Sequence, residues 1–151
     1  MARMHSGSKG KSGSTKPDGK VKADWVKLKP KEIEEIIVNY AKDGLSPSVI
    51  GIKMRDQHGI PSVSDIAGKT VTQILDIHKL RPVLPEDLGN LIRSAVILLK
   101  HIKNNKKDMT AKRGYQLTVS KIRRLAIYYK NEGLLPKDWK YTAEKAALLV
   151  R

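Results

Sequence analysis

The residue types that could do chemistry gather in the last third of this 151-residue chain. His101, Asn105 and Asp108 are spaced four and three apart, with Lys106 and Lys107 between the last two. A neutral imidazole, an amide and a carboxylate can form hydrogen bonds with base edges and 2′-hydroxyl groups, and the lysines can neutralise phosphate. A carboxylate repels phosphate, so Asp108 is expected either to accept from a base amino group or to cap the helix that follows.

More positive charge follows on what the spacing predicts to be one long helix. Lys121, Arg124 and Tyr128 are three and four residues apart, so they lie along one flank of that helix. Guanidinium and phenol groups in such a row can hold phosphates and stack on exposed nucleotides. The alternatives are a half-buried core tyrosine at Tyr128 and a solvated helix face for Arg123 and Arg124. The candidate RNA-binding residues of this stretch are His101, Asn105, Lys106, Lys107, Asp108, Thr110, Lys112, Arg113, Gly114, Lys121, Arg123, Arg124 and Tyr128.

Positive charge is concentrated in two places. Residues 100–130 hold ten basic side chains and one acidic, which gives +9 of the formal net charge of +15. Residues 1–22 add +5, whereas residues 23–99 sum to zero. Clustered positive charge indicates an anionic partner. A uniformly basic surface, in contrast, could serve only to aid solubility. The Gly-, Ser- and Lys-rich residues 1–22 are expected to form a disordered arm that orders on phosphate through Arg3, Lys9 and Lys11, the alternative being a solvated tail.

Composition argues against several other classes of function. The chain has no cysteine, which excludes a disulfide framework, a cysteine-based zinc site and a thiol nucleophile. Its four histidines are far apart, and no Gly-rich phosphate loop or nucleophile motif occurs. No apolar run reaches the roughly 18 residues that a membrane span needs. The sequence therefore predicts no enzyme activity, no cofactor, no metal, no small-molecule substrate and no membrane partner.

The elements that must position the candidate site are all predicted to be helices. Three or four short helices separated by Gly and Pro are expected over residues 31–79. The extended break at residues 81–85 precedes a long helix with a stripe of Leu88, Ile92, Ala95, Leu99 and Ile102, and a second long helix runs from about Thr110 to Asn131.

Two long amphipathic helices joined by a few residues pack antiparallel, and a short helix near residues 141–150 could cover them. The predicted fold class is therefore all-α: a small helical bundle with a long antiparallel helix pair. The predicted parts are a basic disordered arm (1–22), an N-terminal short-helix extension (23–80) and an RNA-binding helical bundle (81–151).

Two rival functions use other parts of the chain. Residues 31–79 resemble a helix-turn-helix in outline, which would suit a DNA-binding or chromatin protein. The stripe from Leu88 to Ile102 could instead hold a protein partner on a pure scaffold. The excess charge lies outside the first region and next to the second, so nucleic-acid binding through residues 100–130 is the favoured interpretation.

The same stretches resemble a known family. The segments His101 to Asp108, Ala111 to Gly114, Ser120 to Leu125 and Tyr128 to Lys130 are similar to the small-subunit ribosomal protein universal family numbered fifteen. The archaeal and eukaryotic branch, whose eukaryotic cytosolic member is numbered thirteen, is matched by residues 1–14, 46–48, 55–61 and 134–141 and by the C-terminal Ala-Leu-Leu-Val. The resemblance covers nearly the whole chain, and its motifs occur in the family's order.

The resemblance implies a primary rRNA-binding protein of the small subunit's platform, in the cytoplasmic ribosome. Its implied partners are small-subunit rRNA and other small-subunit ribosomal proteins, without an obligate homo-oligomer. By position, His101 and Asp108 would contact an rRNA minor groove, and Arg124 and Tyr128 would lie near a three-way junction. The chain departs from the bacterial pattern at residue 105, where Asn replaces a common His, and at residue 111, where Ala replaces a common Ser. Asn105 can still donate and accept hydrogen bonds, whereas the alanine cannot.

Overall fold

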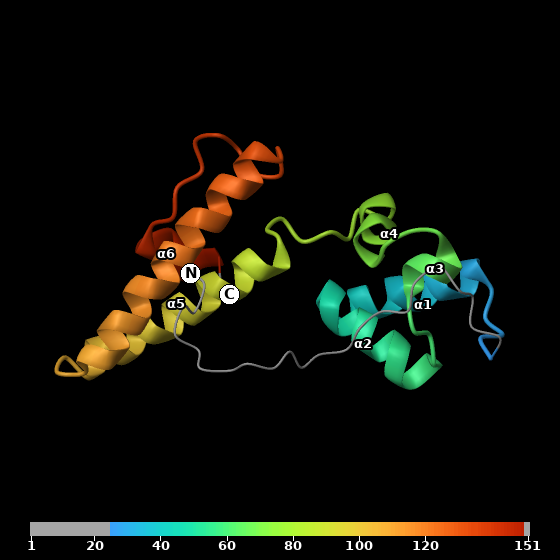
Figure 1. The fold of residues 1–151 in the computed structure, drawn as a ribbon, viewed down its shortest axis with the longest axis horizontal. Helices are drawn as coiled ribbons and strands as arrows, with labels where there is room; N and C mark the ends of the chain where they lie inside the picture. The colour runs from blue at the N-terminus through green and yellow to red at the C-terminus, as the bar shows by residue number, and fades with distance from the viewer. Residues whose placement is uncertain (1–24, 150–151) are drawn as a thin grey trace, which may run out of the picture.

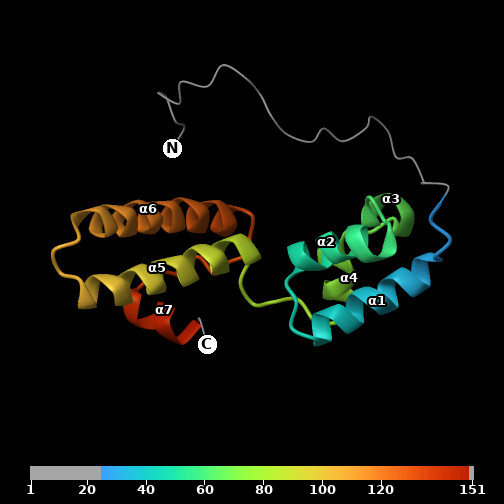
Figure 2. The same ribbon diagram turned by 90° about the horizontal axis from the view of Figure 1, so that it is seen from below.

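The computed structural model describes residues 25–149, and all the regular structure in that range is helical. Seven α-helices follow one another, and none of them is both long and apolar enough to cross a bilayer. The predicted all-α class is confirmed, as is the long antiparallel pair. The predicted arm, with Arg3, Lys9 and Lys11, lies outside the described residues. Figures 1 and 2 show two groups of helices side by side, joined by a short connection.

The first group holds the four short helices α1 (Pro30–Lys42), α2 (Pro47–His58), α3 (Val63–Ala67) and α4 (Val71–Ile77). Proline stands at the first position of α1 and α2, where its missing N–H costs nothing, and glycines in the left-handed region end α2 and α3. The fully buried large side chains of this group are Ile33, Ile37, Ile50, Met54, Ile60, Ile74 and Leu75.

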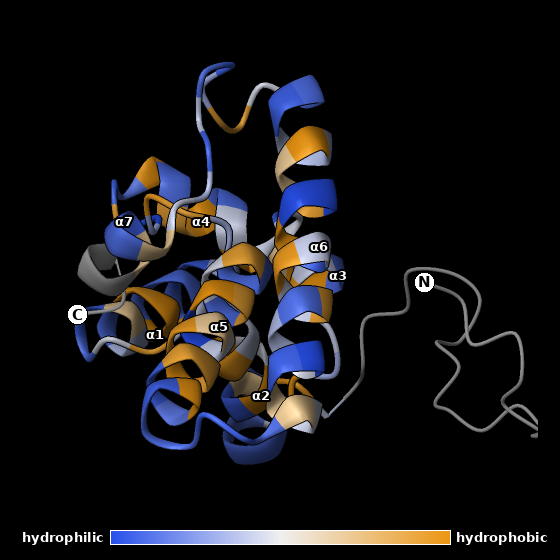
Figure 3. Ribbon diagram, turned by 90° about the vertical axis from the view of Figure 1, so that its left-hand side faces the viewer, coloured by the Kyte–Doolittle hydropathy of each residue, from blue (hydrophilic) through white to orange (hydrophobic). Residues whose placement is uncertain are grey.

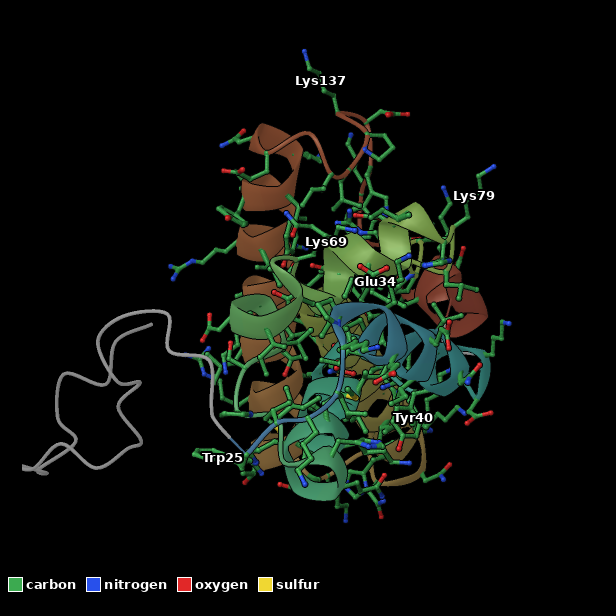
Figure 4. All side chains as sticks on the ribbon, turned by 90° about the vertical axis from the view of Figure 1, so that its right-hand side faces the viewer. Trp25, Glu34, Tyr40, Lys69, Lys79 and Lys137 are labelled. Carbon is green, nitrogen blue, oxygen red and sulfur yellow. The ribbon has the colours of Figure 1, made fainter. Side chains whose placement is uncertain are left out.

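Polar contacts add to this core. Lys69 Nζ lies 3.1 Å from Glu34 Oε1, and Tyr40 donates to Gln57 Oε1 at 2.7 Å (Figure 4). The segment before α1 also packs on this core through Val26, which is buried. Trp25 is 69% exposed but donates its indole N–H to the Gly59 carbonyl at 2.8 Å.

The helix starts of the first group differ in how they are capped. Thr70 and Gln73 form a capping box at the start of α4. Ser46 and Ser62 do stand at the N-cap positions of α2 and α3, but neither side chain makes a capping hydrogen bond. At α2 the physical reason is that a carboxylate from another helix, Glu86, already accepts from the first turn.

The second group consists of α5 (Glu86–Asn104), α6 (Met109–Asn131) and the short α7 (Ala143–Leu149), which packs against α5. Leu88, Ile92, Ala95 and Val96 of α5 meet Ile122 and Ala126 of α6, and Leu135 and Ala146 close the cluster. Figure 3 shows hydrophilic and hydrophobic residues alternating along α6, as expected of a helix with one buried face. Leu99 and Ile102, predicted in the seam, are only partly buried because they lie close to the α5–α6 turn, beyond the last buried residues of α5.

Each group of helices has its own hydrophobic cluster. A polar contact joins the two groups. Glu86, the first residue of α5, accepts a hydrogen bond from the Ser48 backbone N–H at 2.9 Å and another from the Ser48 hydroxyl. Burial acts to raise the pKa of Glu86, but hydrogen bonds from Ser48 and Ser46 outweigh burial and hold the pKa below its ordinary value. A cavity of about 450 Å³ lies beside this contact, lined by Pro47, Leu84, Tyr129 and others.

Candidate RNA interface

The turn between α5 and α6 (residues 105–108) is held by its own polar side chains. Asp108 Oδ2 lies 3.0 Å from His101 Nε2, and Asn105 Nδ2 lies 3.3 Å from His101 Nδ1. An amide nitrogen can only donate, so Nδ1 acts as the acceptor and Nε2–H donates to the carboxylate when the ring is neutral. The Asp108 N–H also donates to the Asn105 carbonyl at 3.2 Å. The three residues predicted to act together are therefore in mutual contact before any ligand binds.

Asp108 is the N-cap of α6. Its Oδ1 accepts from the Ala111 backbone N–H at 2.8 Å, so the capping alternative is confirmed. That bond, followed by the His101 contact, holds the pKa of the Asp108 carboxyl below its ordinary value. A carboxylate offers about four lone-pair sites, so capping leaves capacity to accept from a ligand. The proposed base-acceptor role is compatible with this geometry and stays a prediction.

The cations of the turn surround a shallow hollow. A cavity of about 440 Å³ is lined by His101, Asn104, Asn105, Lys106, Lys107 and Asp108. Lys106 and Lys107 are exposed, as are Thr110 and Arg113, while Lys112 and Gly114 are partly covered on the first turns of α6. Donors that surround a single acceptor group form an arrangement suited to a phosphate-lined groove that also carries hydroxyl and amino groups.

The flank of α6 predicted from spacing is open to solvent. Lys121 and Arg124 are exposed, and Tyr128 is 54% exposed, so its alternative as a half-buried core tyrosine is wrong. None of the ion pairs found among residues 25–149 involves Lys121, Arg123 or Arg124. Exposed cations without an internal carboxylate partner are available to an external anion.

Arg123 does not belong to this flank. It lines a different cavity, together with Tyr115 and Tyr141, on the other side of the helix. Arg3, Lys9 and Lys11 lie outside the described residues. The remaining sequence-predicted residues thus form one group at the turn and one row along α6.

One contact that supports the site was missed from the sequence. Tyr129 places its hydroxyl 2.6 Å and 2.7 Å from the two carboxylate oxygens of Asp87 and donates to that carboxylate. Burial and this bond raise the pKa of Tyr129 to about 12, so it stays a neutral donor. The contact ties the far end of α6 to the start of α5 and orients the neighbouring Tyr128, whose ring meets that of Tyr129 edge-on at 5.2 Å.

The potential metal-ligating side chains of residues 25–149 do not cluster. Within residues 25–149, no group of three or more His, Cys, Asp or Glu side chains is placed to hold a metal ion. A helical bundle with a basic, open surface and a pre-organised polar turn is typical of the class of nucleic-acid-binding proteins.

Comparison with known proteins specifies the family. Residues 1–60 match the "Ribosomal S13/S15 N-terminal domain" model, and residues 72–149 match the "Ribosomal protein S15" model. Three archaeal proteins called "Small ribosomal subunit protein uS15" are similar over almost their whole length. The Cenarchaeum symbiosum protein is 47% identical over 148 residues (98% of this chain, 99% of the relative). The Hyperthermus butylicus protein is 50% identical over 142 residues (94% and 88%). The Nitrosopumilus maritimus protein is 45% identical over 148 residues (98% and 99%).

The chain belongs to the uS15 family of small-subunit ribosomal proteins. The resemblance seen in the sequence is thereby confirmed, including its archaeal character. The family is non-enzymatic.

Proposed function

We propose that this protein binds small-subunit rRNA with two surfaces of the α5–α6 hairpin and so supports assembly of the subunit's platform and translation. The polar turn around Asp108 would contact a helical minor groove. The row of Lys121, Arg124 and Tyr128 would contact a junction, with its cations on phosphate and its phenol on an unstacked base. The observation that carries the proposal is the pre-formed contact of His101, Asn105 and Asp108 in a hollow that Lys106 and Lys107 also line.

Pre-organisation supports this mechanism. Ordering a loop upon binding costs affinity, and here the N-cap bond and the His101 contact already order the turn. RNA duplexes are recognised mainly through shape, 2′-hydroxyls and phosphates across the minor groove. A rigid turn that offers one carboxylate acceptor among cations suits that surface better than a flexible polycation would.

The protein's other partners are proposed from the same family membership. Other small-subunit ribosomal proteins would be neighbours in the cytoplasmic ribosome, and the α1–α4 group, with its balanced charge, offers them a surface. That balance also argues against the rival in which these short helices read DNA, because DNA-binding motifs carry cations for phosphate.

The test is a filter-binding titration at two salt concentrations. Its probes are an rRNA three-way junction fragment, the same RNA with the junction disrupted, and duplex DNA of equal length. If about six cations touch phosphate, the log–log salt slope should be on the order of −5. Selective binding to the intact junction at the higher salt supports the proposal. Equal and salt-labile binding to all three probes would leave only a polycation and would overturn it.

A further inference from the structure

A second candidate contact with RNA lies on the opposite flank of α6. A cavity of about 410 Å³ opens between α6 and the segment that leads into α7. Its lining includes Tyr115, Gln116, Ser120 and Arg123 of α6, and Tyr141 forms the opposing wall. This volume is within the range of small-ligand sites, and no carboxylate is among the lining residues.

Helical spacing separates this cavity from the surface already described. Gln116, Ser120 and Arg123 are four and three residues apart, so they form one row along α6. At about 100° per residue, this row and the row of Lys121 and Arg124 lie on either side of the buried stripe that includes Ile122. The two rows adjoin on the solvent face, where Ser120 and Arg124 are four residues apart, and the second row differs in that Tyr115 and Tyr141 enclose it on the side toward α7.

The cavity's side chains are those that bind an unpaired nucleotide. Tyr115 and Tyr141 interact through their hydroxyls, and burial followed by this contact raises the pKa of Tyr141 to about 12. The phenol therefore stays neutral and does not repel phosphate. Ser120 donates to the Gln116 carbonyl at 3.0 Å, which leaves its oxygen free to accept. The Gln116 side-chain oxygen lies 3.4 Å from an Arg113 guanidinium nitrogen, which leaves its amide N–H groups free to donate.

Positive charge continues beyond the cavity. Tyr141 also lines the neighbouring cavity of about 410 Å³, which contains Lys140 and Lys145 beside a single carboxylate, Asp138. Arg123 is exposed and takes part in none of the ion pairs found among residues 25–149. A chain of phosphates leaving the first cavity past Tyr141 would thus meet further cations.

We propose that this cavity holds one unstacked nucleotide of an RNA strand, with its base against the tyrosines and its phosphate at Arg123. Aromatic faces and guanidinium groups are the usual platforms for splayed bases, and amide and hydroxyl groups read their edges. The inference rests on the proposed function and adds to it a second RNA contact, on the side of α6 that faces the segment leading into α7.

The test uses the full-length protein, a fluorescently labelled single-stranded RNA oligonucleotide and a blunt RNA duplex of the same length. The variants are Arg123→Ala and Gln116→Ala, both at exposed positions. The matched control is Arg93→Ala, which removes the same charge from the exposed surface of α5 outside the cavity. Fluorescence anisotropy gives the affinity, and ultraviolet crosslinking with peptide mass spectrometry reports which tyrosines touch the strand.

Both cavity variants should weaken single-strand binding, by roughly tenfold for Arg123→Ala, and should change duplex binding no more than Arg93→Ala does. Crosslinks should fall on Tyr115 or Tyr141. Equal effects of Arg123→Ala and Arg93→Ala on both probes, with no effect of Gln116→Ala, would overturn the pocket. The junction titration separates the two proposals. If the unmodified protein binds the junction selectively but the cavity variants bind single strands normally, only the nucleotide pocket is refuted. If the unmodified protein shows no selectivity for the junction, the proposed function is refuted.

Discussion

A single methyl group at Gly114 can separate stability from RNA binding. Gly114 lies inside α6, its φ is not positive, and a Cβ built on its backbone meets nothing within 4 Å. The free protein therefore gains nothing from glycine at this position and bears its entropic cost. Gly114→Ala should raise the free energy of unfolding by about 0.5–1 kcal/mol. For a chain of this length, that corresponds to an increase in Tm of roughly 1–4 °C.

The same substitution should weaken RNA binding if the first turns of α6 touch the RNA. A methyl group at a backbone-to-backbone contact holds the two surfaces apart, and a loss of roughly tenfold corresponds to about 1.4 kcal/mol. The control is Gly51→Ala in α2, another helical glycine whose added Cβ meets nothing within 4 Å. It should give a similar stabilisation without weakening binding.

Thermal unfolding followed by circular dichroism, and the junction titration, measure the two effects on the same samples. If Gly114→Ala binds the junction as tightly as the unmodified protein does, the proposed contact at the start of α6 is refuted. A fall in Tm for this variant alone would refute the steric reasoning.

Three further predictions concern single side chains. Asp108→Ala should weaken junction binding in the filter assay although it makes the protein more positive. Asp108→Asn, which keeps an oxygen for the N-cap, should keep α6 intact. Tighter binding of the alanine variant would refute the acceptor role. Tyr128→Ala should lower affinity roughly tenfold but destabilise the free protein by less than about 1 kcal/mol, because the ring is 54% exposed; a large fall in Tm would mean that the ring is structural. Glu86→Ala should destabilise the protein by about 1–2 kcal/mol, seen as faster hydrogen exchange in the first turn of α2, because Ser48 loses its acceptor; unchanged exchange would show that this contact does not cap α2. The pKa of Glu86 is depressed in the folded protein, so its stabilisation should be present above its ordinary pKa of 4.5 and lost as pH falls through the folded value, which urea titrations at a series of pH values would show.

The helices and their buried faces could be predicted from the sequence because the relevant signals are local. The repeat of Leu88, Ile92 and Ala95 fixes the inward face of α5, and Thr70 with Gln73 marks the start of α4. The turn residues were predictable for the same reason, since His101 lies in the last turn of α5 and Asp108, seven residues later, is the N-cap of α6.

What the sequence did not predict depends on contacts between distant segments. Ser46 has the right type for capping α2, yet that role passes to Glu86, forty residues further along the chain. Nothing around Tyr141 indicates that it faces Arg123, because the return of the chain after α6 decides that neighbour. The polar row of Gln116, Ser120 and Arg123 was visible as a spacing, but a polar row alone reads as a solvated surface.

The helices within each group are held together differently from the way the two groups are connected. Within each group a hydrophobic cluster fixes the helices, whereas the connection between the groups depends on the Glu86 contact with α2 and on a linker restricted by Pro82 and Pro85. Lys79 in that linker has φ 57°, a left-handed conformation that costs a non-glycine residue about 1–2 kcal/mol. This cost is similar in size to the net stabilisation that a single hydrogen bond provides. The placement of the two groups therefore depends on the Glu86 contact and on the proline-restricted linker, whereas the α5–α6 turn is held by its own hydrogen bonds.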